Sequence, residues 1–156
     1  MYMHLSVMSQ QHLPALPCMC ANFRRTARAL TQLYDQALRP RGLRATQFTV
    51  LQLLSLAGEV SQGQMGQMLA IDSTTLTRTL AIMLRHRWIT ERRGEDRRER
   101  WLRLTKAGET QFKQALPVWE KVQSDLRRRI GEQPWKDLLQ LTNRVAEFVI
   151  TQGDSL

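Results

Sequence analysis

The chain has 156 residues, 42% of them apolar, which suggests one domain with a hydrophobic core and excludes wholesale disorder. Its 23 Lys and Arg outnumber its 14 Asp and Glu, and the formal charge of +9 favours a polyanionic partner such as nucleic acid. With no run of 18 apolar residues, no export signal and only Cys18 and Cys20 as cysteines, we expect a cytoplasmic protein without a membrane span or a disulfide scaffold.

We expect residues 1–17 to form a flexible N-terminal arm. Residues 18–40 then place apolar side chains at three- and four-residue steps, the pattern of an amphipathic helix. This helix should stop before Pro40, with Gly42 in the connecting turn.

Two helices are predicted next. Thr46 can cap a helix whose apolar residues cover nearly all of its circumference, so we expect burial on all sides until Ala57 and Gly58 end it. Ser61 and Gln64 form a capping-box pattern that opens a short helix.

The following segment predicts a helix with one polar face and then a β-hairpin. Asp72 or Ser73 can cap a helix that runs through Arg87, with leucines on one side and threonine and arginine on the other. Residues 89–93 and 100–105 are short strand-like runs joined by a charged tip at residues 94–99.

Two more helices complete the chain. Thr105 can cap a long helix that Gly131 ends, and Pro134 suits the first turn of the last helix. Trp119, Trp135 and Phe148 are large apolar side chains with little else to pack on, so a partner chain is their simplest cover. The alternative is that these helices fold back onto the rest of the domain.

A mainly α fold with a buried helix, a short capped helix, a polar-faced helix and a small hairpin predicts a winged helix-turn-helix over residues 43–105. The positive charge is concentrated in residues 21–44 and 71–106, each segment carrying a net +5, while residues 107–156 are neutral. A major groove about 12 Å wide admits one such helix, and an arginine-tipped hairpin suits a narrow minor groove.

The predicted DNA contacts are Ser73, Thr74, Thr75, Thr77, Arg78, Arg85, Arg97 and Arg98. We expect Asp96 to stabilise the hairpin tip by bonding a neighbouring arginine or turn amides.

Three runs carry a family resemblance. Residues 72–78 (DSTTLTR), 95–98 (EDRR) and 102–108 (LRLTKAG) resemble the MarR family of bacterial transcription regulators. The resemblance implies a homodimeric repressor with dimerisation helices at 18–40 and 106–152, whose two winged domains read a pseudo-palindromic operator in double-stranded DNA. The family usually has Gly where this chain has Arg87, so we expect a less sharply turned helix end there, with Trp88 under the wing.

The resemblance also implies an effector, either a small aromatic acid or phenolic ligand or an oxidant. Cys20 matches the reactive cysteine of the hydroperoxide-sensing branch, with Tyr34 as one of its tyrosines and Arg24 placed to stabilise the thiolate. Cys18 could join it through a bond between subunits, because neighbours two residues apart rarely meet disulfide geometry. The alternative is that Cys20 is a small buried core or pocket residue.

Other function classes find less support. His12, Cys18 and Cys20 lack the spacing of a known metal site, and we expect no metal, no cofactor and no enzymatic activity. If the chain were an enzyme, a thiol-dependent peroxidase using Cys18 and Cys20 would be the best-supported type. A sequence-indifferent nucleic-acid coat is the other alternative, which would bind scrambled duplexes equally well.

Overall fold

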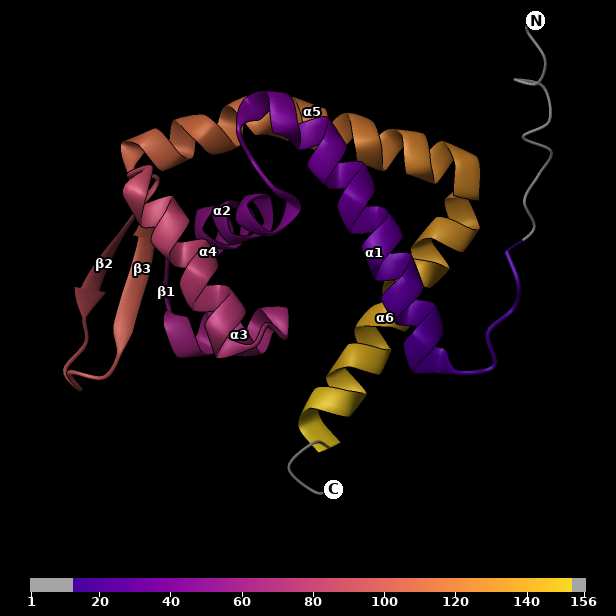
Figure 1. Ribbon diagram of the computed structural model, residues 1–156, viewed down its shortest axis with the longest axis horizontal. Coiled ribbons are helices and arrows are strands. Elements are labelled where there is room, and N and C mark those ends of the chain that lie inside the picture. Colours follow the sequence, from indigo (N-terminus) through magenta and orange to yellow (C-terminus); the bar gives the residue numbers. More distant parts are fainter. Residues whose placement is uncertain (1–12, 153–156) are drawn as a thin grey trace, which may run out of the picture. The chain divides into compact units, whose positions relative to one another are not determined.

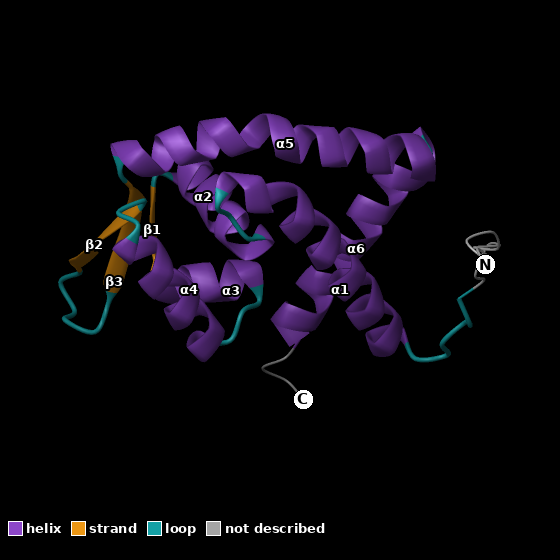
Figure 2. Cartoon of the chain, turned by 45° about the horizontal axis from the view of Figure 1, so that its top comes forward, coloured by secondary structure: helices purple, strands orange, loops and turns teal. Residues whose placement is uncertain are grey.

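The computed structural model describes residues 13–152, and these contain six α-helices, one 3-10 helix and three strands (Figures 1 and 2). Residues 1–12 of the expected N-terminal arm lie outside the described part. The chain separates into two compact units, one ending at Leu33 and one beginning at Tyr34. None of the described helices is long and apolar enough to cross a bilayer.

The first unit contains most of α1 (Met19–Leu38) and the segment that precedes this helix. Arg25 Nη1 donates to the carbonyl oxygen of Pro14 at 2.9 Å. Asn22 Nδ2 donates to the carbonyl oxygen of Leu16. These side chains hold the preceding segment against the first turns of the helix.

In the second unit, α1 ends as predicted and passes into the 3-10 helix η1 (Arg39–Arg41). Gly42 follows with a φ of 72°, a left-handed conformation that glycine adopts without a steric penalty. The turn at Pro40 and Gly42 is therefore confirmed.

The predicted Thr46 cap is wrong, because α2 (Ala45–Ala57) already begins at Ala45. The Asp35 carboxylate of α1 accepts the Ala45 amide at 2.7 Å, and Gln47 Oε1 accepts the Arg44 amide at 2.9 Å. A carboxylate ten residues upstream thus satisfies an amide that the sequence pattern assigned to a local cap.

The core of the second unit is centred on α2. Phe48 and Leu51 are buried, and the Phe48 ring lies 5.4 Å from that of Phe112 and 5.8 Å from that of Trp119. Trp119 therefore packs within its own chain, which corrects the expectation that it needs a partner chain as cover. Burial of α2 on all sides is also wrong, because Leu56 is 82% exposed.

The helix-turn-helix follows as α3 (Gln62–Leu69) and α4 (Ser73–Arg85). The capping box is confirmed, since Ser61 Oγ accepts the Gln64 amide and Gln64 Oε1 accepts the Ser61 amide, each at 3.2 Å. Asp72 is the cap of α4, and this helix ends two residues earlier than predicted.

The hairpin is confirmed as β2 (Ile89–Arg93) and β3 (Arg100–Leu104), which pair antiparallel. A third strand, β1 (Glu59–Ser61), was not predicted, because three residues are too few to display an alternating pattern. It pairs with the other edge of β3, so that the sheet order is β1-β3-β2 and Val60 lies opposite the buried Leu102.

The end of α4, the wing and the start of α5 (Lys106–Ile130) meet at one junction (Figure 1). Arg87 has a φ of 57° there, so it adopts the left-handed turn that glycine usually supplies, and the expected loosening of this corner is wrong. Thr105 Oγ1 donates to the Arg87 carbonyl at 2.6 Å and accepts the Gly108 amide at 3.0 Å. Trp88, expected under the wing, packs against the buried core and stacks on His86, with ring centres 4.4 Å apart. After Gly131, α6 (Glu132–Gln152) completes the chain, with Pro134 in its first turn as predicted.

Gly108→Ala should lower the free energy of unfolding by about 3 kcal/mol, because the added Cβ would overlap the carbonyl oxygen of Trp88. Gly63→Ala is the matched control, since Gly63 is also helical but a Cβ there meets nothing within 4 Å. The control should gain about 0.5–1 kcal/mol from helix propensity. Chemical denaturation measures both values, and equal stability of the two variants would contradict the close approach at Gly108.

Candidate nucleic-acid interface

The first turn of α4 is held by its cap. Asp72 Oδ1 accepts the Thr75 amide at 2.9 Å, and Asp72 Oδ2 accepts the Thr75 hydroxyl at 2.6 Å. These two bonds from Thr75 hold the pKa of the Asp72 carboxyl below its usual value. The Thr75 hydroxyl proton is therefore engaged within the chain.

The side of α4 opposite its buried residues carries Thr74, Arg78, Ala81 and Arg85, which we call the α4 face. These four residues are exposed and follow one another at helical steps of four, three and four. Within the described chain, the side chains of Thr74, Arg78 and Arg85 form no hydrogen bond or ion pair. Ala81 was not predicted, because alanine gives no polar signal; its spacing from Leu76, Leu80 and Met83 could have located it.

Three predicted α4 residues lie outside this face: Thr75, which bonds to Asp72, and Thr77 and Ser73. Gln62 Nε2 donates to Thr77 Oγ1 at 3.2 Å, so the first residue of α3 bonds across to α4. Gln62 was not predicted, since nothing local in the sequence pairs residues fifteen positions apart. Ser73 is exposed at the start of the helix.

The hairpin tip, residues 94–99, is ordered by backbone bonds and by Asp96. Asp96 Oδ1 accepts the Arg98 amide at 3.0 Å, and the Asp96 carbonyl accepts the Glu99 amide at 2.9 Å. The backbone carbonyl of Arg97 accepts from Arg93 Nη1 at 2.9 Å. Both the Arg97 and the Arg98 side chains remain exposed, with no partner among the described residues.

An ion pair and a cation–π contact stabilise the base of the wing. The Arg92 guanidinium pairs with Glu59 of β1 and lies 5.3 Å from the centre of the Trp101 ring. Arg92 holds the pKa of the Glu59 carboxyl below its usual value. Because Glu59 is on β1 and Arg92 on β2, the pair joins both edge strands across β3.

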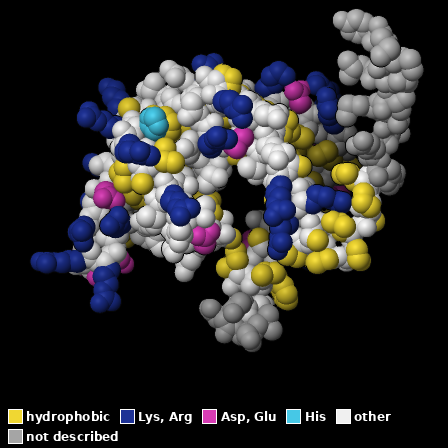
Figure 3. All heavy atoms as spheres, in the orientation of Figure 1, with side chains coloured by type: hydrophobic (Ala, Val, Ile, Leu, Met, Phe, Trp, Pro, Cys, Tyr) yellow, Lys and Arg dark blue, Asp and Glu magenta, His cyan; other side chains and the backbone are white. Residues whose placement is uncertain are grey.

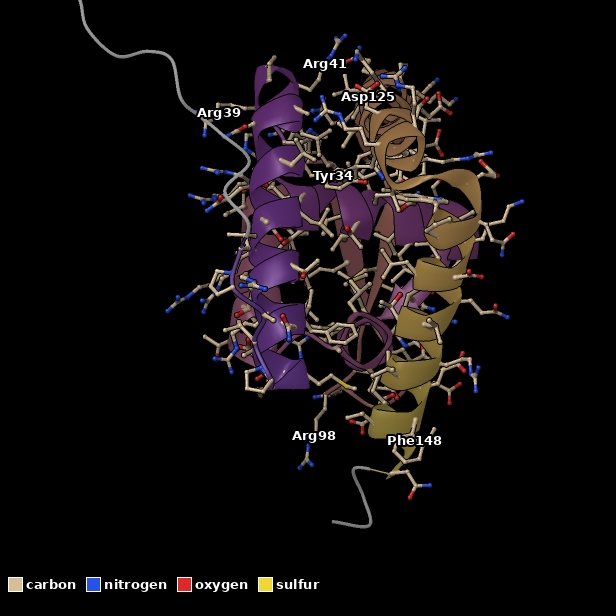
Figure 4. The ribbon with its side chains drawn as sticks, turned by 90° about the vertical axis from the view of Figure 1, so that its right-hand side faces the viewer. Tyr34, Arg39, Arg41, Arg98, Asp125 and Phe148 are labelled. Carbon is tan, nitrogen blue, oxygen red and sulfur yellow. The ribbon has the colours of Figure 1, made fainter. Side chains whose placement is uncertain are left out.

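The N-terminal end of α4 and the hairpin tip reach the same side of the second unit (Figures 1 and 2). Lys and Arg side chains stand out from the hairpin in Figure 3. Arg98 points away from the body of the unit, at the opposite end from Arg39 and Arg41 (Figure 4). A helix of this kind can lie in the major groove of a duplex, and an arginine-bearing hairpin on the same side can enter a minor groove.

Three candidate effector residues, Cys20, Arg24 and Tyr34, lie on α1, and Cys18 directly precedes this helix. Cys18 and Cys20 are both exposed, so the alternative of a buried structural cysteine is wrong for the single chain. Arg24 Nη2 lies 3.8 Å from Cys20 Sγ, as the one-turn spacing predicts. In the second unit Tyr34 is half-buried, and burial raises the pKa of its hydroxyl.

No three His, Cys, Asp or Glu side chains within residues 13–152 come together as a possible metal site. His12, one of the three ligands considered, lies outside the described residues.

An apolar stretch of α6 remains uncovered in the single chain. Phe148 is 67% exposed and Leu141 55% exposed, while Trp135 is half-buried. Hydrophobic side chains gather over the C-terminal part of this helix (Figure 3). Contiguous exposed apolar surface of this kind often marks a protein–protein contact.

Comparisons with known proteins agree with this geometry. Residues 43–99 match the family model of the MarR family. YwoH of Bacillus subtilis (strain 168), an uncharacterized HTH-type transcriptional regulator, is 31% identical over 101 residues, which cover 65% of this chain and 74% of YwoH.

Two solved structures extend the comparison. The Mycobacterium tuberculosis transcriptional regulator MosR, in complex with DNA, is 34% identical with a TM-score of 0.71, covering 82% of this chain and 96% of MosR. A crystal structure of MarR has a TM-score of 0.77 at 20% identity, covers 93% of this chain and 99% of the other, and shows the likeness of fold alone.

Proposed function

The chain belongs to the MarR family of transcriptional regulators, and on that premise we propose that it binds double-stranded DNA as a homodimer. The homodimer recognises a pseudo-palindromic site and represses transcription until a small effector releases it. The observation that carries this proposal is the exposed α4 face together with a hairpin tip whose two arginines have no partner among the described residues; the start of α4 and the tip reach the same side of the second unit. MosR, which was crystallised with DNA, supports it by its 34% identity.

In the proposed complex, α4 lies in the major groove with its N-terminal turns nearest the bases. Arg78 can donate two hydrogen bonds to guanine O6 and N7, and Ser73 and Thr74 bring small hydroxyls close to the duplex. Arg85, near the other end of α4, contacts a phosphate. Thr75 and Thr77 act through Asp72 and Gln62 to hold the helix in place.

The hairpin tip serves as the minor-groove contact. Arg97 and Arg98 enter where a narrow groove concentrates negative potential. Asp96 has no role on the DNA itself, because its carboxylate is oriented toward the Arg98 amide and keeps the tip in shape.

A second copy of the chain is the proposed cover for α6. Residues 18–40 and 106–152 form the dimerisation helices, and residues 43–105 the winged domain. Two copies related by a two-fold axis would place their α4 helices about 34–36 Å apart, one turn of the duplex, which explains a pseudo-palindromic site.

The effector acts at the N-terminal half of α1. A groove of about 490 Å³ there is lined by Leu16, Arg24, Arg25, Arg28 and Gln32 among others, a mixture that suits an aromatic acid. An oxidant is the second candidate effector, favoured by the exposed Cys20 beside Arg24. A hydroperoxide would oxidise the Cys20 thiolate to a sulfenic acid and itself be reduced to an alcohol. Family membership favours this sensing role over a peroxidase with turnover.

Arg78→Ala should reduce the preference for the specific site over a scrambled duplex by about tenfold to a hundredfold, because one base contact is lost. Arg98→Ala should weaken binding to both duplexes and lower the slope of log K against log salt by about one. Arg41→Ala, which removes one positive charge at the opposite end of the second unit from Arg98, is the charge-matched control and should change neither. Fluorescence anisotropy titrations at several salt concentrations measure these effects. Equal losses for Arg78→Ala on both duplexes would refute its role in base recognition.

Phe148→Asp should convert the dimer to a monomer at micromolar concentration, because the dimer would bury an unpaired carboxylate. Gln140→Asp adds the same charge on the polar side of α6 and should leave the dimer intact. Sedimentation equilibrium distinguishes the two. A Phe148→Asp protein that stays dimeric would show that α6 does not form the interface.

Peroxide should release the wild-type protein from DNA and leave the Cys20→Ser protein bound, because serine forms no sulfenic acid. Each protein is titrated with cumene hydroperoxide on its specific site, and Cys18→Ser shows whether the second thiol takes part. Release of Cys20→Ser at the wild-type peroxide concentration would end the oxidant hypothesis and leave the aromatic acid.

A further inference from the structure

The α4 face restricts which bases it can recognise; this inference rests on the DNA binding proposed above. The whole of α4 contains no Asn, Gln, Asp or Glu. Side chains of Asn and Gln are the usual bidentate partners of adenine, and those of Asp and Glu accept from the cytosine amino group. Neither base has a dedicated reader on this helix, so the remaining specific chemistry is arginine with guanine and methyl groups with thymine.

Ala81 makes this restriction sharper. It is exposed at the centre of the α4 face, between Arg78 and Arg85. Its side chain is a single methyl group that can neither donate nor accept a hydrogen bond. The thymine C5-methyl is the apolar group that base edges present in the major groove, and alanine is a known contact for it.

Thr74 supplies a second methyl group on the same face, two turns before Ala81. Thr75 and Thr77, by contrast, use their hydroxyls on Asp72 and Gln62. Arg78 lies between Thr74 and Ala81 along the helix. One guanine reader is thus flanked on both sides by methyl groups.

We propose that each half-site contains a guanine read by Arg78 with thymines on both sides of it, whose C5-methyl groups contact Thr74 and Ala81. The chemical class recognised by α4 is therefore a thymine-rich major-groove edge around a single guanine. Recognition of such a site depends on direct contact with the thymine C5-methyl groups and not on the shape of the duplex alone.

The test replaces thymine by uracil, which removes the C5-methyl group and leaves the Watson–Crick pairing unchanged. The site is first obtained by selecting bound duplexes from a random pool. Each thymine of one half-site is then replaced in turn, and the dissociation constant is measured. One or two replacements next to the guanine should weaken binding about fourfold each, the effect of exposing one methyl group.

Paired variants assign each methyl group. Thr74→Ser removes the methyl and keeps the hydroxyl, so it should abolish the uracil effect at one position, whereas Thr74→Val keeps the methyl and should retain that effect. Ala81→Gly should abolish the effect at the other position. Thermal unfolding checks that each variant is folded, and the comparison of thymine with uracil within one variant cancels any loss of stability.

The outcomes separate this inference from the function on which it rests. If a site is selected but uracil changes no dissociation constant, the methyl recognition is wrong and sequence-specific binding stands. A uracil effect that persists in both Thr74→Ser and Ala81→Gly also overturns it. If no sequence is enriched from the random pool, the proposed function itself fails.

Discussion

The contact of Thr105 and Gly108 with the turn at Arg87 and Trp88 is the constraint on which the winged domain depends. One hydroxyl donates to the Arg87 carbonyl and accepts from the first turn of α5, while the missing side chain of Gly108 lets that helix approach the Trp88 carbonyl. α4, the two long strands and α5 all begin or end here. The connection between α4, the wing and α5 therefore depends on one side-chain hydroxyl and on a close backbone approach that tolerates no added side chain.

With this junction in place, the polar groups of the domain divide into two sets. One set is used internally, as in the cap by Asp72, the link from Gln62 and the turn bond of Asp96. The other set, which includes Arg78 and Arg98, has no partner in the described chain. A side chain without an internal partner keeps its full hydrogen-bonding capacity for a ligand. The N-terminal end of α4 and the hairpin tip, which carry such side chains, reach the same side of the unit. The groups that stabilise the domain are thus different from those proposed to bind DNA.

Much of the fold was predictable because its signals are local. The caps at Ser61, Asp72 and Thr105, the stop at Gly131 and the hairpin around Asp96 each depend on residues within a few positions of one another. The errors came from contacts between distant residues. Burial of Trp119 against Phe48 joins positions far apart in the chain, and so does the capping of α2 by Asp35.

The sequence by itself determined the order of the helices, the hairpin, the excess of arginine and the polar side of α4, because periodicity, caps and charge are properties of neighbouring residues. Only the tertiary structure decided which groups of that polar side remain free and that Arg87 supports a left-handed turn. It also placed Arg39 at the opposite end of the second unit from Arg98 of the hairpin tip. These features depend on how elements pack against one another, and packing joins residues that the order of the chain keeps apart.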